Sequence, residues 1–448
     1  MFVARLFGTD GVRGVANAEL TPELAFRLGW AAAYYFGREH DSPSFLIGRD
    51  TRVSGQMLEA ALCAGICAAG GNAVVLGVIP TPGVAWLTRT MKAAAGIVIS
   101  ASHNPFVDNG IKFFSGTGYK LPDAVEDELD EIVTEKMDSL PRPTGKAVGS
   151  ISYKYDLINA FLDFSCGTVK ENLSGLRVVI DCANGAAFES APAVLSRLGL
   201  ALKVLNADPD GVNINDNCGS THMQSLQDAV VAEKADLGLA FDGDADRCLA
   251  VDENGQIVDG DQIMVILALE LLRRKELNRD TLVTTVMSNI GLHQAMRRAG
   301  GKVVVTAVGD RYVLEAMQKE NLSLGGEQSG HIIFGSHSTT GDGLMTALQL
   351  LAAVKRSGMA LSKLGSLMTR FPQVLVNVRV GSKNGWEENA NITAAIQNAQ
   401  FQLGEDGRVL VRASGTEPLI RVMAEGPVLA ELEKMAAEVA EVIKTELH

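Results

Sequence analysis

The stretch that determines the fold class is residues 177–205, which read RVVIDCANGAAFESAPAVLSRLGLALKVL. An apolar run at 177–180 is followed by a turn, a helical stretch that ends at Gly199, and a second apolar run at 202–205. Two apolar runs joined by a helix that ends at a glycine indicate a β-α-β unit. Strands this uniformly apolar are typical of parallel sheets that helices cover on both faces.

The same plan recurs twice more in the chain. It covers residues 45–76, where the helix is predicted to end at Gly70, and residues 282–305, where the helix is predicted to end at Gly300. The sequence therefore predicts three similar α/β domains in series, with mixed or parallel sheets. The turn after the first strand of each unit lies at a carboxyl end, where such sheets bind their ligands.

The pattern changes after Pro372. The predicted elements there are a strand at 374–380, a helix at 389–401, strands at 408–412 and 418–423, and a helix at 429–447. This order predicts a small C-terminal α+β domain, and a length of 448 residues agrees with three or four domains. The predicted domains are residues 1–148, 149–251, 252–370 and 371–448.

Composition narrows the class of partner. The formal net charge of −13 is unfavourable for binding nucleic acid or an anionic membrane, so an anionic small molecule would need local positive charge. Residues 60–88 carry no charge, but Gly70-Gly71-Asn72 and Pro80-Thr81-Pro82 divide them, which favours a buried helix and strand over a membrane span. The six cysteines form no C-x-x-C pair and the N-terminus has no long apolar segment, so we expect a reduced, cytoplasmic protein.

The strongest motif is the aspartate loop, Asp242-Gly243-Asp244-Ala245-Asp246-Arg247. In extended backbone its three carboxylates project toward one side, and an oxygen-only set of this charge suits Mg²⁺. A solvated acidic turn is the plainer alternative, but aspartates without a balancing cation would repel one another strongly. An EF-hand calcium loop, with Glu253 as its twelfth residue, is disfavoured because Arg247 stands where that loop needs glycine and both flanks are predicted strands.

A second motif is the serine loop, Ser100-Ala101-Ser102-His103-Asn104-Pro105, which follows an apolar strand at 96–99. Asn, Pro and Ser are also ordinary turn residues. A serine needs activation or charge neutralisation to react, and His103 is too close in sequence to be a good triad base. We therefore favour a Ser102 that carries a phosphoryl group. Lys112 is a candidate to orient the phosphate or transfer a proton, with a plain surface lysine as the alternative.

The Arg412 loop, Arg412-Ala413-Ser414-Gly415-Thr416-Glu417-Pro418, lies near the C-terminus. Together with Arg421 it offers two guanidinium groups, two hydroxyls and backbone N–H groups around a glycine. Such a set suits a phosphate that is held but not transferred, and a plain hairpin turn is the alternative.

The Glu327 loop, residues 325–331, offers Glu327 and Ser329 to grip sugar hydroxyls and His331 as an acid–base or phosphate partner. Its order does not match the nucleophile elbow of hydrolases. Near the N-terminus, Arg13 is a candidate phosphate contact. The run Gly48-Arg49-Asp50-Thr51-Arg52 is expected to be structural or inter-domain instead of catalytic.

These four loops, in this order and together with Phe7-Gly8-Thr9-Asp10-Gly11, resemble those of the α-D-phosphohexomutases. The resemblance covers essentially the whole chain. It implies four domains around a central cleft, a homodimer, and an isomerase that moves a phosphoryl group within a small sugar phosphate. It also implies that Ser102 is phosphorylated in the active enzyme.

The roles that the resemblance implies fall into four groups. The catalytic residues would be Ser102, His103, Lys112, Arg13, Arg247 and His331. One Mg²⁺ per subunit would be held by Ser102, Asp242, Asp244 and Asp246. The sugar would be bound by Glu327 and Ser329, and the distal phosphate by Arg412, Ser414, Gly415, Thr416 and Arg421.

The implied reaction passes a phosphoryl group from Ser102 to a hexosamine or hexose phosphate through a 1,6-bisphosphate, which also serves as primer. Gln328 and residues 216–222 resemble the branch that acts on glucosamine phosphate, which feeds UDP-N-acetylglucosamine and cell-wall synthesis. The phosphomannomutase/phosphoglucomutase branch shares the remaining motifs. More distant alternatives are a Mg²⁺-dependent sugar phosphatase with an aspartyl nucleophile and a non-catalytic sugar-phosphate sensor.

Overall fold

The computed structural model describes residues 5–8, 10–39, 42–404, 406–413 and 419–447. The chain forms two compact units. The first combines Met1–Val286 with Val303–Ser366, and the second combines Met287–Lys302 with Leu367–His448. Helix α9 (Ile290–Arg298) therefore belongs to the second unit, although the sequence places it inside the predicted third domain. The limits of the four predicted domains stay predictions.

A six-stranded sheet forms the N-terminal part of the first unit, in the order β1-β5-β4-β2-β3-β6. Its strands are β1 (Val12–Val15), β2 (Ser44–Arg49), β3 (Asn72–Val78), β4 (Ala95–Ile99), β5 (Asp108–Ser115) and β6 (Ile151–Tyr153). Its helices are α1 (Pro22–Phe36), α2 (Gly55–Ala68), α3 (Thr81–Met91) and α4 (Asp123–Glu131). Strands β2, β3, β4 and β6 run parallel, whereas β5 runs antiparallel to β4 and β1.

The uncharged stretch at 60–88 forms the end of α2, strand β3 and the start of α3, as the sequence predicts for its first two elements. Leu62 and Ile66 of α2 and Val84 of α3 are fully buried, so this stretch supplies core. Among the residues that the structure describes, no helix is long and apolar enough to cross a membrane.

A five-stranded sheet follows, in the order β11-β10-β9-β7-β8. Its strands are β7 (Arg177–Asp181), β8 (Ala201–Leu205), β9 (Leu237–Phe241), β10 (Cys248–Asp252) and β11 (Ile257–Val258). Its helices are α5 (Ile158–Gly167), α6 (Ala187–Arg197) and α7 (Gln224–Ala232). Residues 177–205 form β7, α6 and β8, and β7 pairs in parallel with β8, so the central β-α-β prediction is confirmed.

The third sheet has the order β13-β12-β14-β15. Its strands are β12 (Thr281–Thr285), β13 (Lys302–Thr306), β14 (Leu324–Gly326) and β15 (Ile332–Phe334). The helices around it are α8 (Gly260–Arg274), α10 (Asp310–Glu320), α11 (Gly343–Ser357) and α12 (Leu361–Gly365). Asp259 and Gln262 form a capping box that begins α8, which supplies partners for N–H groups that the first turn leaves open.

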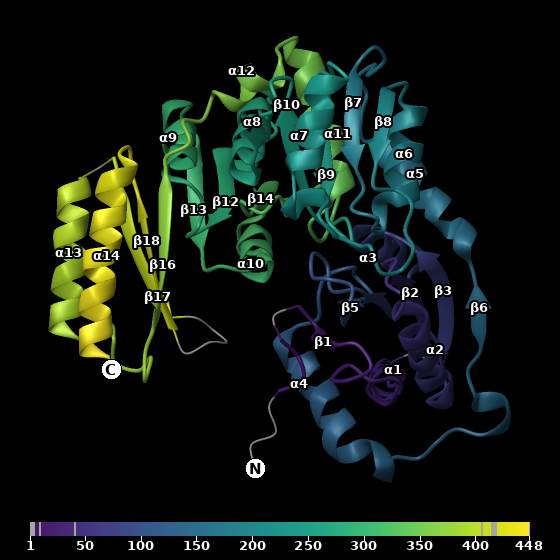
Figure 1. Ribbon diagram of the computed structural model, residues 1–448. Coiled ribbons are helices and arrows are strands. Elements are labelled where there is room, and N and C mark those ends of the chain that lie inside the picture. Colours follow the sequence, from purple (N-terminus) through teal and green to yellow (C-terminus); the bar gives the residue numbers. More distant parts are fainter. Residues whose placement is uncertain (1–4, 9, 40–41, 405, 414–418, 448) are drawn as a thin grey trace. The chain divides into compact units, whose positions relative to one another are not determined.

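The C-terminal sheet in the second unit has the order β16-β18-β17, with all pairs antiparallel. Its elements are β16 (Gln373–Arg379), α13 (Ala390–Leu403), β17 (Arg408–Ala413), β18 (Leu419–Glu425) and α14 (Leu429–Glu446). Helices α13 and α14 lie side by side on one face of this sheet (Figure 1). Ile392, Ile420 and Ile443 are fully buried between the two layers. The predicted α+β domain is confirmed, and with the three α/β sheets it completes the predicted fold class.

Three of the four loops lie at carboxyl ends of strands in the first unit. The serine loop follows β4, the aspartate loop follows β9, and the Glu327 loop follows β14. Since sheets of this kind gather their ligand contacts at those ends, the topology alone brings the three loops toward one another.

Candidate active site

The serine, aspartate and Glu327 loops line one cavity of about 460 Å³ in the first unit. Seven residues predicted from the sequence line it: Arg13, Ser102, His103, Asp246, Arg247, Glu327 and His331. Asp10 and Asp310 also line it, although neither was among the predicted site residues. Charged side chains of both signs line the cavity, so it offers an anionic ligand both cationic groups and hydrogen-bond partners.

Ser102 lines this cavity and is 1% exposed. Its Oγ donates a hydrogen bond to Oδ2 of Asp242 over 2.6 Å. The Nδ1 atom of His103 is 3.5 Å from the same Oγ. The pKa of His103 is lowered to about 4, first by burial and then by the positive charges of Arg247 and Arg13. At neutral pH this imidazole is therefore uncharged beside the serine hydroxyl.

The aspartate loop brings its three carboxylates together, and one oxygen from each lies within 4.8 Å of the others. The expectation of an extended backbone is wrong: residues 243–245 form a turn, and Ala245 has a left-handed φ of 58°. The turn still points the three carboxylates inward because the chain reverses between β9 and β10, which pair antiparallel. Glu253 lies apart from them and accepts a hydrogen bond from Ser362 N, so an EF-hand loop is excluded.

The chemistry of these carboxylates fits a hard divalent cation. Asp242, Asp244 and Asp246 are all buried. Oδ1 of Asp244 and Oδ1 of Asp246 have no hydrogen-bond partner among the residues that the structure describes. Burial, followed by the charges of Asp246 and Asp244, raises the pKa of Asp242 well above its ordinary value. A bound Mg²⁺ would relieve that repulsion and use the free oxygen atoms.

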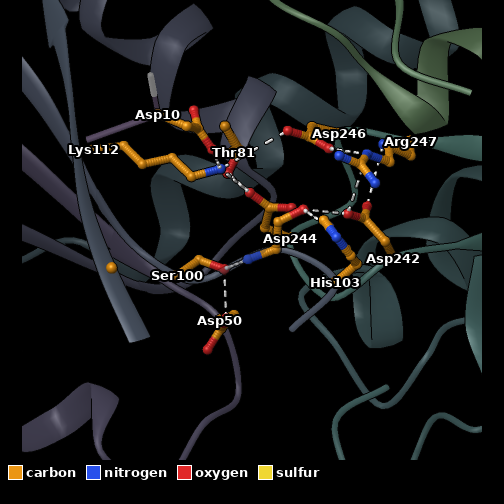
Figure 2. Close-up of polar contacts among 12 residues, drawn as sticks. Asp10, Asp50, Thr81, Ser100, His103, Lys112, Asp242, Asp244, Asp246 and Arg247 are labelled. Atoms are coloured by element: carbon orange, nitrogen blue, oxygen red, sulfur yellow. Dashed lines mark hydrogen bonds and ion pairs between the residues drawn. The ribbon is translucent and has the colours of Figure 1, made fainter. Parts of the chain in front are cut away.

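Lys112 projects from β5 into the carboxylate cluster, so a plain surface lysine is excluded. Its Nζ is 2.9 Å from Oδ2 of Asp244 and 2.9 Å from Oδ2 of Asp10 (Figure 2). Burial disfavours its charged form, but Asp10 and Asp244 raise the pKa of Lys112 above its ordinary value. Thr81, the first residue of α3, donates its hydroxyl to the same Oδ2 of Asp244 over 2.7 Å.

Arg247 lies on the other side of the cluster. Its Nε is 4.0 Å from Oδ2 of Asp242 and 3.8 Å from Oδ1 of Asp246 (Figure 2). Its side chain is 23% exposed and lines the cavity, so its remaining N–H groups can face a ligand. Arg13 lines the same cavity and pairs with Asp10.

A charged network that the sequence did not predict connects the N-terminal sheet with α10. Lys120 donates to Oδ1 of Asp10 over 2.5 Å and to Oδ2 of Asp310 over 2.6 Å. The Nε2 atom of His331 is 3.5 Å from Oδ2 of Asp310 and 3.8 Å from Oδ2 of Asp246. The only sequence signal was position: Asp310 follows β13 at a carboxyl end, and Asp10 stands in a glycine-rich loop.

The two predicted sugar contacts differ in their surroundings. Oε1 of Glu327 accepts a hydrogen bond from Gly309 N over 3.1 Å, and Glu327 lines the cavity. Ser329 does not line it, but its buried Oγ has no hydrogen-bond partner within the described part of the chain. Glu327 is therefore held in place by backbone, whereas the Ser329 hydroxyl keeps its hydrogen-bonding capacity.

The predicted phosphate contacts belong to the second unit. Arg412 of β17 and Arg421 of β18 are directly opposite each other in the strand register. Burial and the charge of Arg421 lower the pKa of Arg412. Like charges opposite each other on two strands are unfavourable, so an anion between them would be stabilising. Ser414, Gly415 and Thr416 lie outside the described residues.

Gly243 is where the aspartate loop packs against the serine loop. A Cβ atom at Gly243 would lie 2.5 Å from the Ser102 carbonyl oxygen and 2.8 Å from Nδ2 of Asn215. We expect Gly243→Ala to separate the two loops, to lower kcat about 100-fold and to destabilise the protein by about 1–3 kcal/mol.

The check is a coupled activity assay together with urea unfolding. Gly167→Ala is the matched control, because a Cβ at Gly167 would meet nothing within 4 Å. A Gly243→Ala variant with the wild-type kcat would contradict the close packing of the two loops.

Comparison with known proteins gives the class of this chain. The phosphoglucomutase/phosphomannomutase models for alpha/beta/alpha domains I, II and III match residues 4–139, 156–255 and 259–371, and the model for the C-terminal domain matches residues 375–442. The chain therefore belongs to the phosphoglucomutase/phosphomannomutase family, and it is a mutase, as the resemblance to the α-D-phosphohexomutases predicts. A relative from Symbiobacterium thermophilum, a phosphoglucosamine mutase, is 60% identical over 447 residues, which are 99% of this chain and 100% of the relative.

Solved structures agree on the fold. A phosphoglucomutase/phosphomannomutase family protein from Burkholderia thailandensis is 25% identical with a TM-score of 0.83, over 99% of this chain and 98% of that chain. The N-acetylphosphoglucosamine mutase of Aspergillus fumigatus, solved with GlcNAc-6P and magnesium, is 18% identical with a TM-score of 0.71, over 99% of this chain and 96% of that chain. At that identity the second match speaks for the fold alone.

Proposed function

We propose that this protein is a phosphoglucosamine mutase, an isomerase that interconverts glucosamine 6-phosphate and glucosamine 1-phosphate. The observation that carries the chemistry is the 2.6 Å hydrogen bond from Ser102 Oγ to Asp242 inside a buried trio of aspartates. The choice of sugar is supported by the 60% identity to a phosphoglucosamine mutase over the whole chain.

In the first step, phosphorylated Ser102 gives its phosphoryl group to O1 of glucosamine 6-phosphate. The bond from phosphorus to O1 forms, the bond from phosphorus to Ser102 Oγ breaks, and the proton lost from O1 is balanced by the one that Oγ gains. The product is a 1,6-bisphosphate. His331 and the neutral His103 lie at the cavity as candidates to carry the proton.

In the second step, the bisphosphate has turned around and Ser102 Oγ takes the phosphoryl group from O6. O6 gains a proton, glucosamine 1-phosphate leaves, and the phosphoserine is restored. A hexosamine or hexose 1,6-bisphosphate would therefore also prime an enzyme that has lost its phosphoryl group.

Charge neutralisation is the main task of the surrounding side chains, because phosphoryl transfer has a loose transition state with charge on the equatorial oxygens. Asp242, Asp244 and Asp246, with the phosphorylated Ser102, would hold one Mg²⁺ per subunit. When bound, the ion would supply positive charge next to the transferred phosphoryl group. Lys112 and Arg247 add positive charge from the two sides of the carboxylate cluster. Arg13 is available at the cavity wall.

The other end of the ligand needs different contacts. Glu327 and Ser329 are assigned to the sugar hydroxyls, and Glu327 also suits the 2-ammonium group of glucosamine. Arg412 and Arg421, with Ser414, Gly415 and Thr416, are assigned to the phosphate that is not transferred. Because the intermediate turns around, this site must accept the phosphate of either end.

We also propose that the chain is organised as four domains with limits near residues 148, 251 and 370, that it forms a homodimer, and that it works in the cytoplasm. All six cysteines are free, which agrees with a reducing compartment. The product would supply amino-sugar metabolism and peptidoglycan precursors.

The test of the sugar class is a coupled assay with glucosamine, glucose and mannose 6-phosphates. We expect kcat/KM for glucosamine 6-phosphate to exceed the other two values at least about tenfold. Equal values for all three sugars would overturn the choice of substrate, and a preference for mannose or glucose phosphate would favour the phosphomannomutase/phosphoglucomutase branch.

A further inference from the structure

Arg52 lies beneath the serine loop with a fully buried side chain. Its Nε donates to Oδ2 of Asp50 over 2.8 Å. Its two Nη atoms donate to four backbone carbonyl oxygens, those of Ser102, Asn104, Pro105 and Asp108. A guanidinium group has five N–H donors, so these five bonds use all of them.

The carbonyl oxygen of Ser102 is held from two sides. It accepts from Nη2 of Arg52 over 2.9 Å and from Nδ2 of Asn215 over 2.9 Å. The carbonyl oxygen of Asn104 accepts from the same two groups, at 2.9 and 3.1 Å. Asn215 lies between β8 and β9 of the five-stranded sheet, whereas Arg52 follows β2 of the six-stranded sheet. Two parts of the first unit therefore hold the same two carbonyl groups.

The residue held by these hydrogen bonds, Ser102, has an unusual backbone conformation. Ser102 has a φ of 51°, in the left-handed region that residues with a side chain rarely adopt. Such a conformation persists only when the surroundings over-determine it, and two hydrogen bonds on the Ser102 carbonyl do so. The backbone angles in turn set the direction of Cβ, and therefore of the Oγ atom that meets Asp242.

The hydrogen bonds to the Ser102 carbonyl group also orient the peptide group between Ser102 and His103. The peptide between Ser102 and His103 is trans, so its N–H points opposite to its carbonyl group. Since the carbonyl points at Arg52, the His103 N–H points away from Arg52. Ser102 and His103 both line the cavity.

We propose that Arg52 is a positioning residue for the reactive serine. By collecting the carbonyl oxygens of the serine loop, it holds Ser102 in the left-handed conformation that aims Oγ at the aspartate loop and turns the His103 N–H toward the phosphoryl group. The proposal rests on the proposed function, in which Ser102 carries that group. It gives Arg52 a specific role within residues 48–52, a run that the sequence predicts to be structural or inter-domain instead of catalytic.

Lysine cannot replace arginine in this role. An ammonium group is a point donor with three N–H bonds, whereas the guanidinium fork reaches acceptors in several fixed directions. Arg52→Lys would keep the charge beside Asp50 and lose most of the carbonyl contacts. It therefore separates the geometry of the serine loop from the burial of a positive charge.

The experiment compares Arg52→Lys with Arg49→Lys in the full-length enzyme. Arg49 belongs to the same run, with 15% of its side chain exposed, and its described partners are Glu59 and the Asp50 carbonyl, outside the serine loop. We expect Arg52→Lys to lower kcat about 100-fold, with KM for glucosamine 6-phosphate changed less than about threefold, because the sugar contacts are intact. Arg49→Lys should keep kcat within about threefold of wild type.

A second readout follows the phosphoserine itself. The rate at which a 1,6-bisphosphate phosphorylates Ser102, measured by intact mass, should fall with kcat in Arg52→Lys and not in Arg49→Lys. If Arg52→Lys does not fold, Asn215→Ala decides, with an expected loss of about tenfold in kcat at unchanged KM.

The outcomes distinguish a failure of the positioning role of Arg52 from a failure of the proposed mutase function. A folded Arg52→Lys enzyme with the wild-type kcat, or losses of kcat that follow stability equally in both arginine variants, would overturn the positioning role. So would a folded Asn215→Ala enzyme with the wild-type kcat. A wild-type enzyme without mutase activity, or one that never carries phosphate on Ser102, would contradict the proposed function instead.

Discussion

Ser102→Ala is expected to abolish mutase activity, with kcat lowered at least about 10⁴-fold. The alanine has no atom to carry the phosphoryl group. Among the described residues, two neighbouring hydroxyls have other partners, since Thr81 donates to Asp244 and Ser100 donates to Asp50. The measurement is the coupled assay, together with intact-mass analysis after incubation with a 1,6-bisphosphate. The wild type should gain one phosphoryl group and the variant none.

Ser190→Ala is the matched control, because Ser190 is also 1% exposed but lies in α6. It should keep the wild-type kcat. The same comparison tests the phosphatase alternative, in which an aspartate of the aspartate loop is the nucleophile. If net phosphate release from sugar phosphates survives in Ser102→Ala, that alternative is favoured and the phosphoserine mechanism is wrong.

Asp242→Asn is expected to have the second largest effect, a loss of roughly 100- to 1000-fold in kcat. The variant removes one of three clustered carboxylates and so weakens the proposed Mg²⁺ site. In wild type, Mg²⁺ at 100 times its dissociation constant should stabilise the folded protein by about 2.7 kcal/mol. In Asp242→Asn, the same Mg²⁺ concentration should give little stabilisation, which thermal unfolding with and without EDTA would reveal.

Without the metal ion, Asp242→Asn is not expected to lower the stability of the folded protein. Burial and two neighbouring aspartates raise the pKa of Asp242, which means that its charged form is less stable in the folded protein than in the unfolded chain. A neutral asparagine relieves this repulsion, so in EDTA we expect Asp242→Asn to be at least as stable as wild type. Asp252→Asn is the control: Asp252 is 5% exposed and accepts from the backbone N–H groups of Asn254 and Gln256. Equal Mg²⁺ stabilisation of wild type and Asp242→Asn would contradict the proposed metal site.

Much of the candidate site could be selected from the sequence, because its groups are local in the chain. The aspartate loop carries three potential ligands within five residues, and the serine loop follows a recognisable apolar strand. The backbone geometry of these loops was harder to predict from the sequence. The carboxylates converge through a turn with a left-handed Ala245, which alternate spacing alone does not predict.

The partners of isolated charged residues could not be predicted. Lys120 and Asp310 carry no local motif and are 190 residues apart, yet their side chains are 2.6 Å apart. Arg52 was expected to be structural, and nothing in its run indicates that its acceptors are carbonyl groups some 50 residues away. Every residue has a backbone carbonyl group, so the sequence does not indicate which of them accept hydrogen bonds from a buried guanidinium group.

The sequence by itself determined the order of β-α-β units, the C-terminal α+β domain and the identity of the loops at the strand ends. These features depend on periodicity and turn chemistry, which act over a few residues. Only the tertiary structure decided the surroundings of Ser102: Arg52 and Asn215 at its carbonyl group, Asp242 at its hydroxyl, and the network of Asp10, Lys120 and Asp310 at the cavity. Those contacts join segments far apart in the chain, and the packing of the sheets fixes which of many possible charged partners meet.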